Sequence, residues 1–244
     1  TVFYLTAHDF FDDGSAAVCT MTGEVWLVRG IDETLETLRW KRFASGLHQP
    51  LGMKIVDGKV HVIGRDQITC LHDLNGDDET DYYECVTNAM ETSIGGHNFV
   101  VGLEQNLEGR WIYTSGNEGL CRISADNSVE VLATGFRNPN GLAMSPDGRF
   151  LTTSGQEGDW TPASRVFQVE LGRNEGAHFG AGGPKDGQDP EPPLLYLPRG
   201  EDNSSSSQAV ISGEKWAPLA GDGNLVHLSS GGASAWLVMR EQVN

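Results

Sequence analysis

Basic residues are scarce in this sequence. Its 244 residues include 17 lysines and arginines against 34 aspartates and glutamates, which gives a formal net charge of −17 at pH 7. A surface with that charge repels the phosphate backbone of nucleic acids and anionic membranes, so neither is expected as a partner. Long apolar runs are also missing. No stretch approaches 18 consecutive apolar residues, and no membrane insertion is expected.

Paired cysteine motifs are absent too. The four cysteines, Cys19, Cys70, Cys85 and Cys121, form no C-x-x-C pair, which excludes zinc-ribbon, thioredoxin and c-type haem signatures. An even number of cysteines in an acidic, glycine-rich chain is typical of a secreted or periplasmic protein with up to two disulfides. Cys70–Cys85 is the favoured pairing because the two flank one acidic loop, and four buried free thiols are the open alternative.

Several catalytic motifs are missing as well. The sequence contains no G-x-S-x-G, no Walker loop, and no G-x-G-x-x-G after an expected strand. Serine hydrolases, nucleotide-driven enzymes and Rossmann dehydrogenases therefore lose support as functional classes.

Glycine, by contrast, is abundant at 31 residues, which favours a fold with many turns over a helical bundle. The expected hairpins join 16–20 with 24–28, 53–56 with 60–63, 100–103 with 111–114, and 141–144 with 150–153. A weak helical pattern covers 31–38. Residues 180–193 and 203–208 have the composition of loops.

The hairpins recur at a long period. Their turn glycines, Gly14, Gly58, Gly109 and Gly148, lie 44, 51 and 39 residues apart, which suits β-propeller blades of about four strands. A two-sheet sandwich is the alternative, and it would show turns without the longer repeat. We therefore expect an all-β fold in which residues 1–244 form a single β-propeller domain. It would hold about four to five blades, would be incomplete at the C-terminus, and would have six blades when complete.

Residues 73–84 match a calcium-binding loop in their spacing. The oxygen ligands would be Asp73, Asn75, Asp77, Asp81 and Glu84, with Glu79 contributing through its backbone carbonyl. Two positions depart from the pattern: Asp78 replaces the usual glycine, and Thr80 replaces an aliphatic residue. A solvated acidic turn is the alternative. A bound calcium would be structural, because the loop joins two strands and its carboxylates repel one another without a cation.

One histidine stands out by its position. His97 lies just before the first strand of an expected blade, and such loops line the central mouth of a propeller, where ligands bind. A neutral imidazole can act as a general base near pH 7. The alternative is an ordinary loop histidine.

Two further polar groups occupy related positions. Arg137 and Asn138 precede the next blade, and a guanidinium beside an amide suits a ligand that bears carboxylates. Glu157 and Asp159 follow the second strand of that blade, near Trp160, and carboxylates with an aromatic suit a sugar. Ordinary turns are the alternative in both cases, since Asn-Pro at 138–139 is common turn chemistry.

The run 133–142, with Pro-Asp-Gly at 146–148, resembles the soluble quinoprotein glucose/sorbosone dehydrogenases. That resemblance implies a six-bladed propeller that binds pyrroloquinoline quinone (PQQ) and calcium. It implies that His97 takes the proton of a sugar hydroxyl and that Arg137 and Asn138 contact the quinone. The family has His-Gly-Leu where this chain has His97-Asn98-Phe99, and its later cationic quinone contacts come from blades beyond this sequence.

A closer resemblance is to the propeller domains of large secreted bacterial proteins of the membrane-bound dehydrogenase type. It is carried by 42–52, 71–77, 197–200 and 202–205. Members often add a c-type haem domain, so a longer chain with a haem domain or another electron acceptor is implied.

The resemblance predicts a secreted oxidoreductase that oxidises a sugar or another alcohol with PQQ. One alternative is a non-catalytic propeller that binds carbohydrate or a protein partner. Another is a polysaccharide lyase or hydrolase that uses His97 with a carboxylate.

Overall fold

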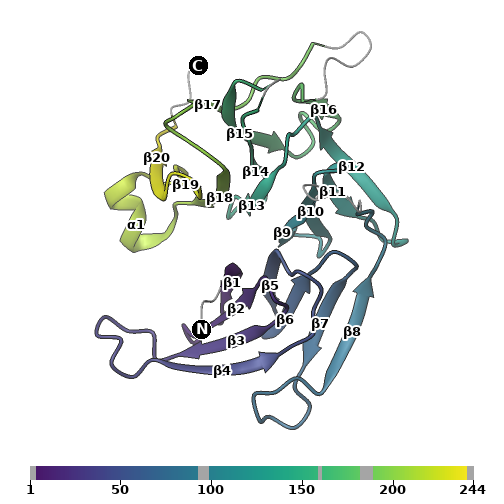
Figure 1. The fold of residues 1–244 in the computed structure, drawn as a ribbon, viewed down its shortest axis with the longest axis vertical. Helices are drawn as coiled ribbons and strands as arrows, with labels where there is room; N and C mark the ends of the chain where they lie inside the picture. Colours follow the sequence, from purple (N-terminus) through teal and green to yellow (C-terminus); the bar gives the residue numbers. More distant parts are fainter. Residues whose placement is uncertain (1–3, 93–98, 159–160, 182–188, 241–244) are drawn as a thin grey trace.

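The computed structural model describes residues 4–92, 99–158, 161–181 and 189–240. In this part of the chain the strands form five separate sheets. Figure 1 shows the sheets following one another in chain order around a common centre, with the first strand of each sheet innermost. This arrangement is a β-propeller with five blades, so the predicted all-β architecture is confirmed.

The blades are made of consecutive strands. Blade 1 comprises β1 (Leu5–Phe10), β2 (Ala16–Thr20), β3 (Val25–Arg29) and β4 (Arg39–Ala44). Blade 2 comprises β5 (Gly52–Val56), β6 (Lys59–Ile63), β7 (Ile68–His72) and β8 (Tyr82–Thr87). Blade 3 comprises β9 (Val100–Gln105), β10 (Trp111–Ser115), β11 (Gly119–Ile123) and β12 (Val129–Thr134), extended by the short parallel strand β16 (Ala177–His178).

Two blades complete the described part of the chain. Blade 4 comprises β13 (Asn140–Met144), β14 (Phe150–Gly155), β15 (Ala163–Glu170) and β17 (Leu195–Pro198). Blade 5 comprises β18 (Ser205–Val210), β19 (Leu225–Ser229) and β20 (Ser234–Val238). A helix, α1 (Gly213–Ala220), connects β18 to β19.

An apolar core lies between each pair of successive blades, because the sheets stack face to face. Blades 1 and 2 share Val25, Leu27, Val60 and Val62. Blades 2 and 3 share Ile63, Ile68, Trp111 and Tyr113. Blades 3 and 4 share Leu132, Leu151 and Phe167. Blades 4 and 5 share Val166, Leu197, Leu225 and Val238. Burial on both faces gives the inner strands nearly continuous apolar sequences instead of a strict alternation.

Glycines let the innermost strands approach one another near the centre. A Cβ added to Gly52 would lie less than 3.0 Å from backbone atoms of Gly102 on the next blade. A Cβ on Gly102 would overlap Leu142, and one on Gly141 would overlap Ser207. Gly102 and Gly141 also have positive φ, at +67° and +70°. Three successive blade contacts therefore depend on the missing side chain of a glycine.

The sequence predicted the inner hairpins and missed most of the outermost strands. β4, β8 and β12 expose much of their length, so they lack the apolar runs by which a strand is recognised. The helical pattern at 31–38 was misleading, because these residues form turns and bends. The loop predicted at 203–208 was also wrong. From Ser205 onward it forms β18, an innermost strand, where small side chains fit the crowded centre.

The favoured disulfide is not formed, because all four cysteines are free. On the ladder between β7 and β8, Cys70 lies opposite Glu84, whereas Cys85 lies opposite Thr69. Neighbouring residues of a strand point to opposite faces of the sheet, so the two thiols are on different faces. Cys85 is exposed and the other three thiols are buried, which is close to the alternative of four buried thiols.

A buried polar network joins the strands of blade 5. Asp202 accepts a hydrogen bond from Ser205, and its Oδ2 lies 3.4 Å from Nε2 of His227. Nδ1 of His227 lies 3.1 Å from the amide nitrogen of Gln208. Burial lowers the pKa of His227 despite the attraction of Asp202. Burial works to raise the pKa of Asp202, but hydrogen bonds from Ser205 and Ser229 hold it below its usual value.

Acid is therefore expected to destabilise blade 5. The unfolded chain protonates His227 near the ordinary histidine pKa of 6.5, while the folded chain binds that proton only at lower pH, so stability falls as the pH drops below about 6.5. His227→Gln should make the melting temperature less dependent on pH between about 7.5 and about 5.5. The measurement is thermal unfolding in EDTA at several pH values, and an unchanged slope would contradict the role of His227.

Candidate functional site

The turn before β13 holds one predicted pair of site residues against the loop after β14. The carbonyl of Arg137 accepts a hydrogen bond of 2.9 Å from the backbone N–H of Gln156. The guanidinium of Arg137 donates to the carbonyl of Glu157. The amide of Asn138 donates to Oε1 of Gln156 at 3.3 Å, and Asn138 has a φ of +43°. The structure thus brings Arg137, Asn138 and Glu157 together at one end of blade 4.

A second guanidinium reaches the same loop. Arg199, just after β17, donates to the carbonyl of Gly158 at 3.0 Å. A Cβ on Gly158 would overlap the guanidinium of Arg137, so a larger residue here would displace that guanidinium. Arg199 was not among the site residues predicted from the sequence, because it follows Arg137 by many residues and only the pairing of β15 with β17 brings it near.

The carboxylate of Glu157 is held within the blade. Its Oε2 accepts a hydrogen bond of 2.7 Å from Ser164 on β15, and Ser164 is fully buried. Asp159 and His97, which complete the predicted substrate-binding and catalytic residues, lie outside the described residues. Their predicted roles stay predictions.

Three aromatic rings pack together next to the Arg137 turn. The rings of Phe136, Phe167 and Phe179 lie within 5.3 Å of one another, measured between centroids, and all three are buried. Phe179 follows β16, which pairs in parallel with β12, so it returns to the end of the strand that leads into the turn. Rigid aromatic packing next to a polar turn fixes the position of that turn.

The acidic loop between β7 and β8 is folded around its first carboxylate. Asp73 accepts hydrogen bonds from the backbone N–H groups of Gly76, Asp77 and Asp78. Burial works to raise the pKa of Asp73, but these backbone donors hold it below its usual value. Asn75 accepts from the N–H of Asp77 at 2.9 Å.

The remaining loop positions continue this pattern. Asp77 accepts from the N–H of Glu79 at 3.0 Å, and Asp81 accepts from the N–H of Leu74 at 2.7 Å. The carboxylate of Glu79 lies 3.5 Å from Nζ of Lys41 in the neighbouring blade. Successive turns therefore gather Asp73, Asn75, Asp77 and Asp81 in one short segment.

The two sequence departures in this loop have structural explanations. Asp78, at the position where glycine is usual, has a φ of +63°, in the left-handed region that glycine favours. Its carboxylate pairs with Arg29 of blade 1 at 2.5 Å and 2.7 Å, and this hydrogen-bonded pair lowers the pKa of Asp78. Thr80 donates its backbone N–H to the carbonyl of Phe43, also in blade 1. Both residues attach the loop to the neighbouring blade.

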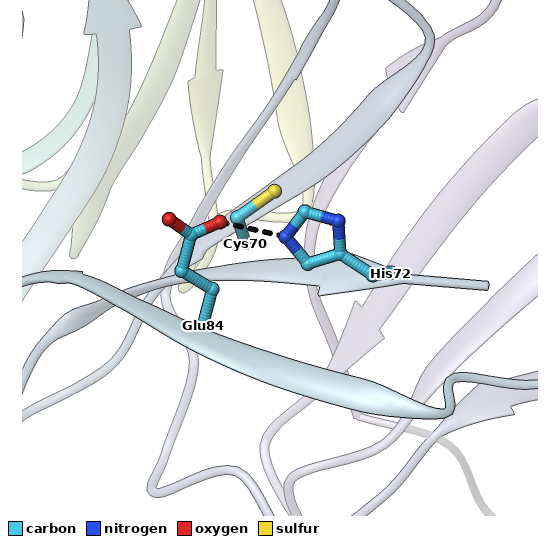
Figure 2. A group of neighbouring side chains, drawn as sticks. All are labelled: Cys70, His72 and Glu84. Carbon is cyan, nitrogen blue, oxygen red and sulfur yellow. Dashed lines mark hydrogen bonds and ion pairs between the residues drawn. The ribbon is translucent and has the colours of Figure 1, made fainter. Parts of the chain in front are cut away.

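Glu84, the last predicted calcium ligand, has a different neighbour. It lies on β8 opposite Cys70, and its Oε2 is 2.7 Å from Nε2 of His72. Figure 2 shows Glu84, His72 and Cys70 converging on one face of blade 2. The structure thus places Glu84 beside a thiol and an imidazole, whereas the other five predicted calcium ligands lie in the segment 73–81. Calcium binding by these residues stays a prediction.

Comparisons with known proteins support the fold. No family model matches this chain, and no curated protein matches it in sequence. Solved structures do match. An oxidoreductase from Thermus thermophilus, described as a glucose dehydrogenase, is 16% identical with a TM-score of 0.75, over 99% of this chain and 81% of that one. The PQQ-bound aldose sugar dehydrogenase from Streptomyces coelicolor is 13% identical with a TM-score of 0.73, over 99% of this chain and 78% of that one.

The chain has the propeller fold of these sugar dehydrogenases. This agrees with the resemblance found in the sequence. A gluconolactonase from Xanthomonas campestris is also similar, with 12% identity and a TM-score of 0.61, over 98% of this chain and 75% of that one. Among the described residues, the structure has no helix long and apolar enough to cross a membrane.

Proposed function

We propose that this chain is the propeller of a secreted or periplasmic sugar oxidoreductase that uses PQQ. The observation that carries the proposal is the convergence of Arg137 and Arg199 on the loop 156–158, with Asn138 beside them. Two guanidinium groups meet at one end of a blade, in a chain of net charge −17, where they can attract an anionic ligand. The similarity to sugar dehydrogenase propellers supports the same function.

The residues of this site fit a cofactor that carries several carboxylates. The guanidinium of Arg137, which carries five N–H donors, would direct some of them toward a carboxylate of the cofactor. Arg199 would add a second positive charge. Asn138 offers both a donor and an acceptor. A hydrogen bond to Oε1 of Gln156 orients the amide of Asn138.

The chain's own residues would then transfer the proton and bind the substrate. PQQ, when bound, would supply the hydride acceptor. His97 would take the proton of the substrate hydroxyl as general base. Glu157 and Asp159 would hold the other hydroxyls of a sugar or similar alcohol. Ser164 keeps the carboxylate of Glu157 in a fixed orientation, which favours directional hydrogen bonds to a substrate.

Calcium belongs to the same proposal, in the loop 73–84. The inward-folded side chains of Asp73, Asn75, Asp77 and Asp81 offer hard oxygen atoms, and Glu79 offers its backbone carbonyl. Asp78 and Thr80 tie the loop to blade 1, so calcium would brace two blades against each other. Further domains that accept electrons, including a haem domain of a longer chain, remain a prediction from the resemblance.

Calorimetric titration with PQQ in the presence of calcium tests the proposal. We expect saturable one-site binding, and Arg137→Ala should weaken it about 10- to 100-fold, because a charge-assisted contact is lost. His97→Ala should abolish oxidation of a sugar panel with an artificial electron acceptor while leaving the fold unchanged.

Arg149→Ala is the matched control, since Arg149 is exposed in the hairpin turn at the other end of blade 4. Its PQQ affinity should equal that of the unmodified chain. Absence of PQQ binding, or equal loss in both arginine variants, would instead favour a non-catalytic propeller that binds carbohydrate or a protein partner.

A further inference from the structure

Blade 2 carries a thiol, an imidazole and a carboxylate close together beside the acidic loop, and the carboxylate is that of Glu84, the last predicted calcium ligand. Cys70 and His72 are two residues apart on β7, so they share one face of the sheet. Glu84 lies directly opposite Cys70 on β8, on the same face. The thiol, imidazole and carboxylate ligand atoms all lie within 4.8 Å of one another (Figure 2).

Strand pairing makes this a preorganised group. Two of the side chains are fixed by their spacing along β7, and the third is fixed by the register between β7 and β8. His72 is further held by Tyr82, whose ring centroid lies 5.6 Å from that of the imidazole. His61 lies opposite Cys70 on β6, but its ring packs on Trp111 and its Nδ1 lies 3.1 Å from the carbonyl of Lys59.

The chemistry of the three groups selects a class of ion. A thiolate with an imidazole is a typical ligand pair for Zn²⁺ and its first-row neighbours, whereas calcium and magnesium take oxygen ligands. Three protein ligands with one position left for water form an open tetrahedral site. Tetrahedral bond lengths require ligand atoms roughly 3.3–3.8 Å apart, so a small rotation of the side chains would complete the geometry.

A redox-reactive thiol accounts less well for Cys70. Cys70 is buried and unpaired, and burial and the nearby Glu84 raise its pKa, the reverse of what an oxidation-sensitive thiol needs. Glu84, on the other hand, is half exposed and leaves a path from solvent to the group.

We propose that Cys70, His72 and Glu84 bind one Zn²⁺-class ion on blade 2, at a site distinct from the predicted calcium ligands Asp73 to Asp81. The ion would bridge β7 and β8 next to the start of the loop, at Asp73. In the structure Nε2 of His72 and Oε2 of Glu84 share one hydrogen bond, and the ion would take the place of that proton. The Sγ atom of Cys70 would bind as the thiolate and release its proton on binding.

Cobalt(II) absorption spectroscopy of the full chain, with calcium in excess to fill the loop, tests this proposal. Co²⁺ reports a thiolate ligand by a sulfur-to-metal charge-transfer band and reports tetrahedral geometry by intense visible bands. We expect one equivalent of Co²⁺ to produce both, and one equivalent of Zn²⁺ to remove both. Cys70→Ala should lose the charge-transfer band, and His72→Ala and Glu84→Gln should weaken binding at least about tenfold.

Cys85→Ser is the matched control, because Cys85 is an exposed thiol on the same strand as Glu84 but on the opposite face. It should keep the full spectrum. Asp73→Asn should keep it too, which separates the ion from the calcium loop. Absence of the charge-transfer band in the unmodified chain, its persistence in Cys70→Ala, or its loss in Cys85→Ser would overturn the proposal. Glu84→Gln, a change at a half-exposed residue, keeps the test valid if Cys70→Ala fails to fold.

Discussion

Gly102→Ala is expected to lower the free energy of unfolding by about 2–5 kcal/mol. Gly102 lies on the innermost strand β9 with a φ of +67°, and a left-handed backbone costs an alanine about 1–2 kcal/mol. The new methyl group would also overlap the side chain of Leu142 on β13, and overpacking adds about 1–3 kcal/mol. The effect would act on the contact between blades 3 and 4. Urea and thermal unfolding, followed by circular dichroism, would measure it.

Gly109→Ala separates the two contributions. Gly109 lies in the hairpin turn after β9 with a similar φ of +77°, but no atom lies within 4 Å of its added Cβ. This variant should lose only the backbone contribution, about 1–2 kcal/mol. Equal losses in the two variants would mean that β9 and β13 accommodate the added methyl group without cost, so that their close approach does not require a glycine.

Removal of calcium is expected to have the second large effect. At a free calcium concentration of about 100 times its dissociation constant, a ligand of the folded state adds about 2.7 kcal/mol of stability. For a chain of this size, that corresponds to a rise in melting temperature of about 5–11 °C relative to EDTA. The physical source is the crowding of acidic side chains from Asp73 to Asp81, which a cation relieves. Differential scanning calorimetry with EDTA and then with added calcium would measure the change.

Asp73→Asn should reduce this calcium effect, because Asp73 is the carboxylate around which the loop folds. Asp126→Asn is the matched control. Asp126 makes a similar turn with Ser128, at 2.6 Å to its hydroxyl, but lies in the turn between β11 and β12. The control should respond to calcium like the unmodified chain. If the melting temperature of the unmodified chain is the same in EDTA and in calcium, residues 73–84 are a solvated acidic turn.

The sequence predicted the inner part of each blade better than its edge. Alternating or continuous apolar runs, with turns at Gly58, Gly109 and Gly148, identified the inner hairpins and their long period, because burial on both faces requires such runs. Outer strands such as β8 expose most of their side chains and carry no comparable signal. The serine-rich strand β18 was predicted as a loop, because its need for small side chains comes from crowding by β13 and not from its own pattern.

The candidate sites also differ in how much of each the local sequence indicated. Spacing within one segment was enough to propose residues 73–84 as a calcium loop and to single out the pair Arg137 and Asn138, because their members are close along the chain. Both assignments stay predictions. Register and blade packing decided the rest. Only the β7–β8 ladder places Glu84 and Cys70 face to face and separates Cys70 from Cys85. Only the β15–β17 pairing brings Arg199 to the loop beside Arg137, since contacts between distant segments depend on which strands pair and not on local sequence.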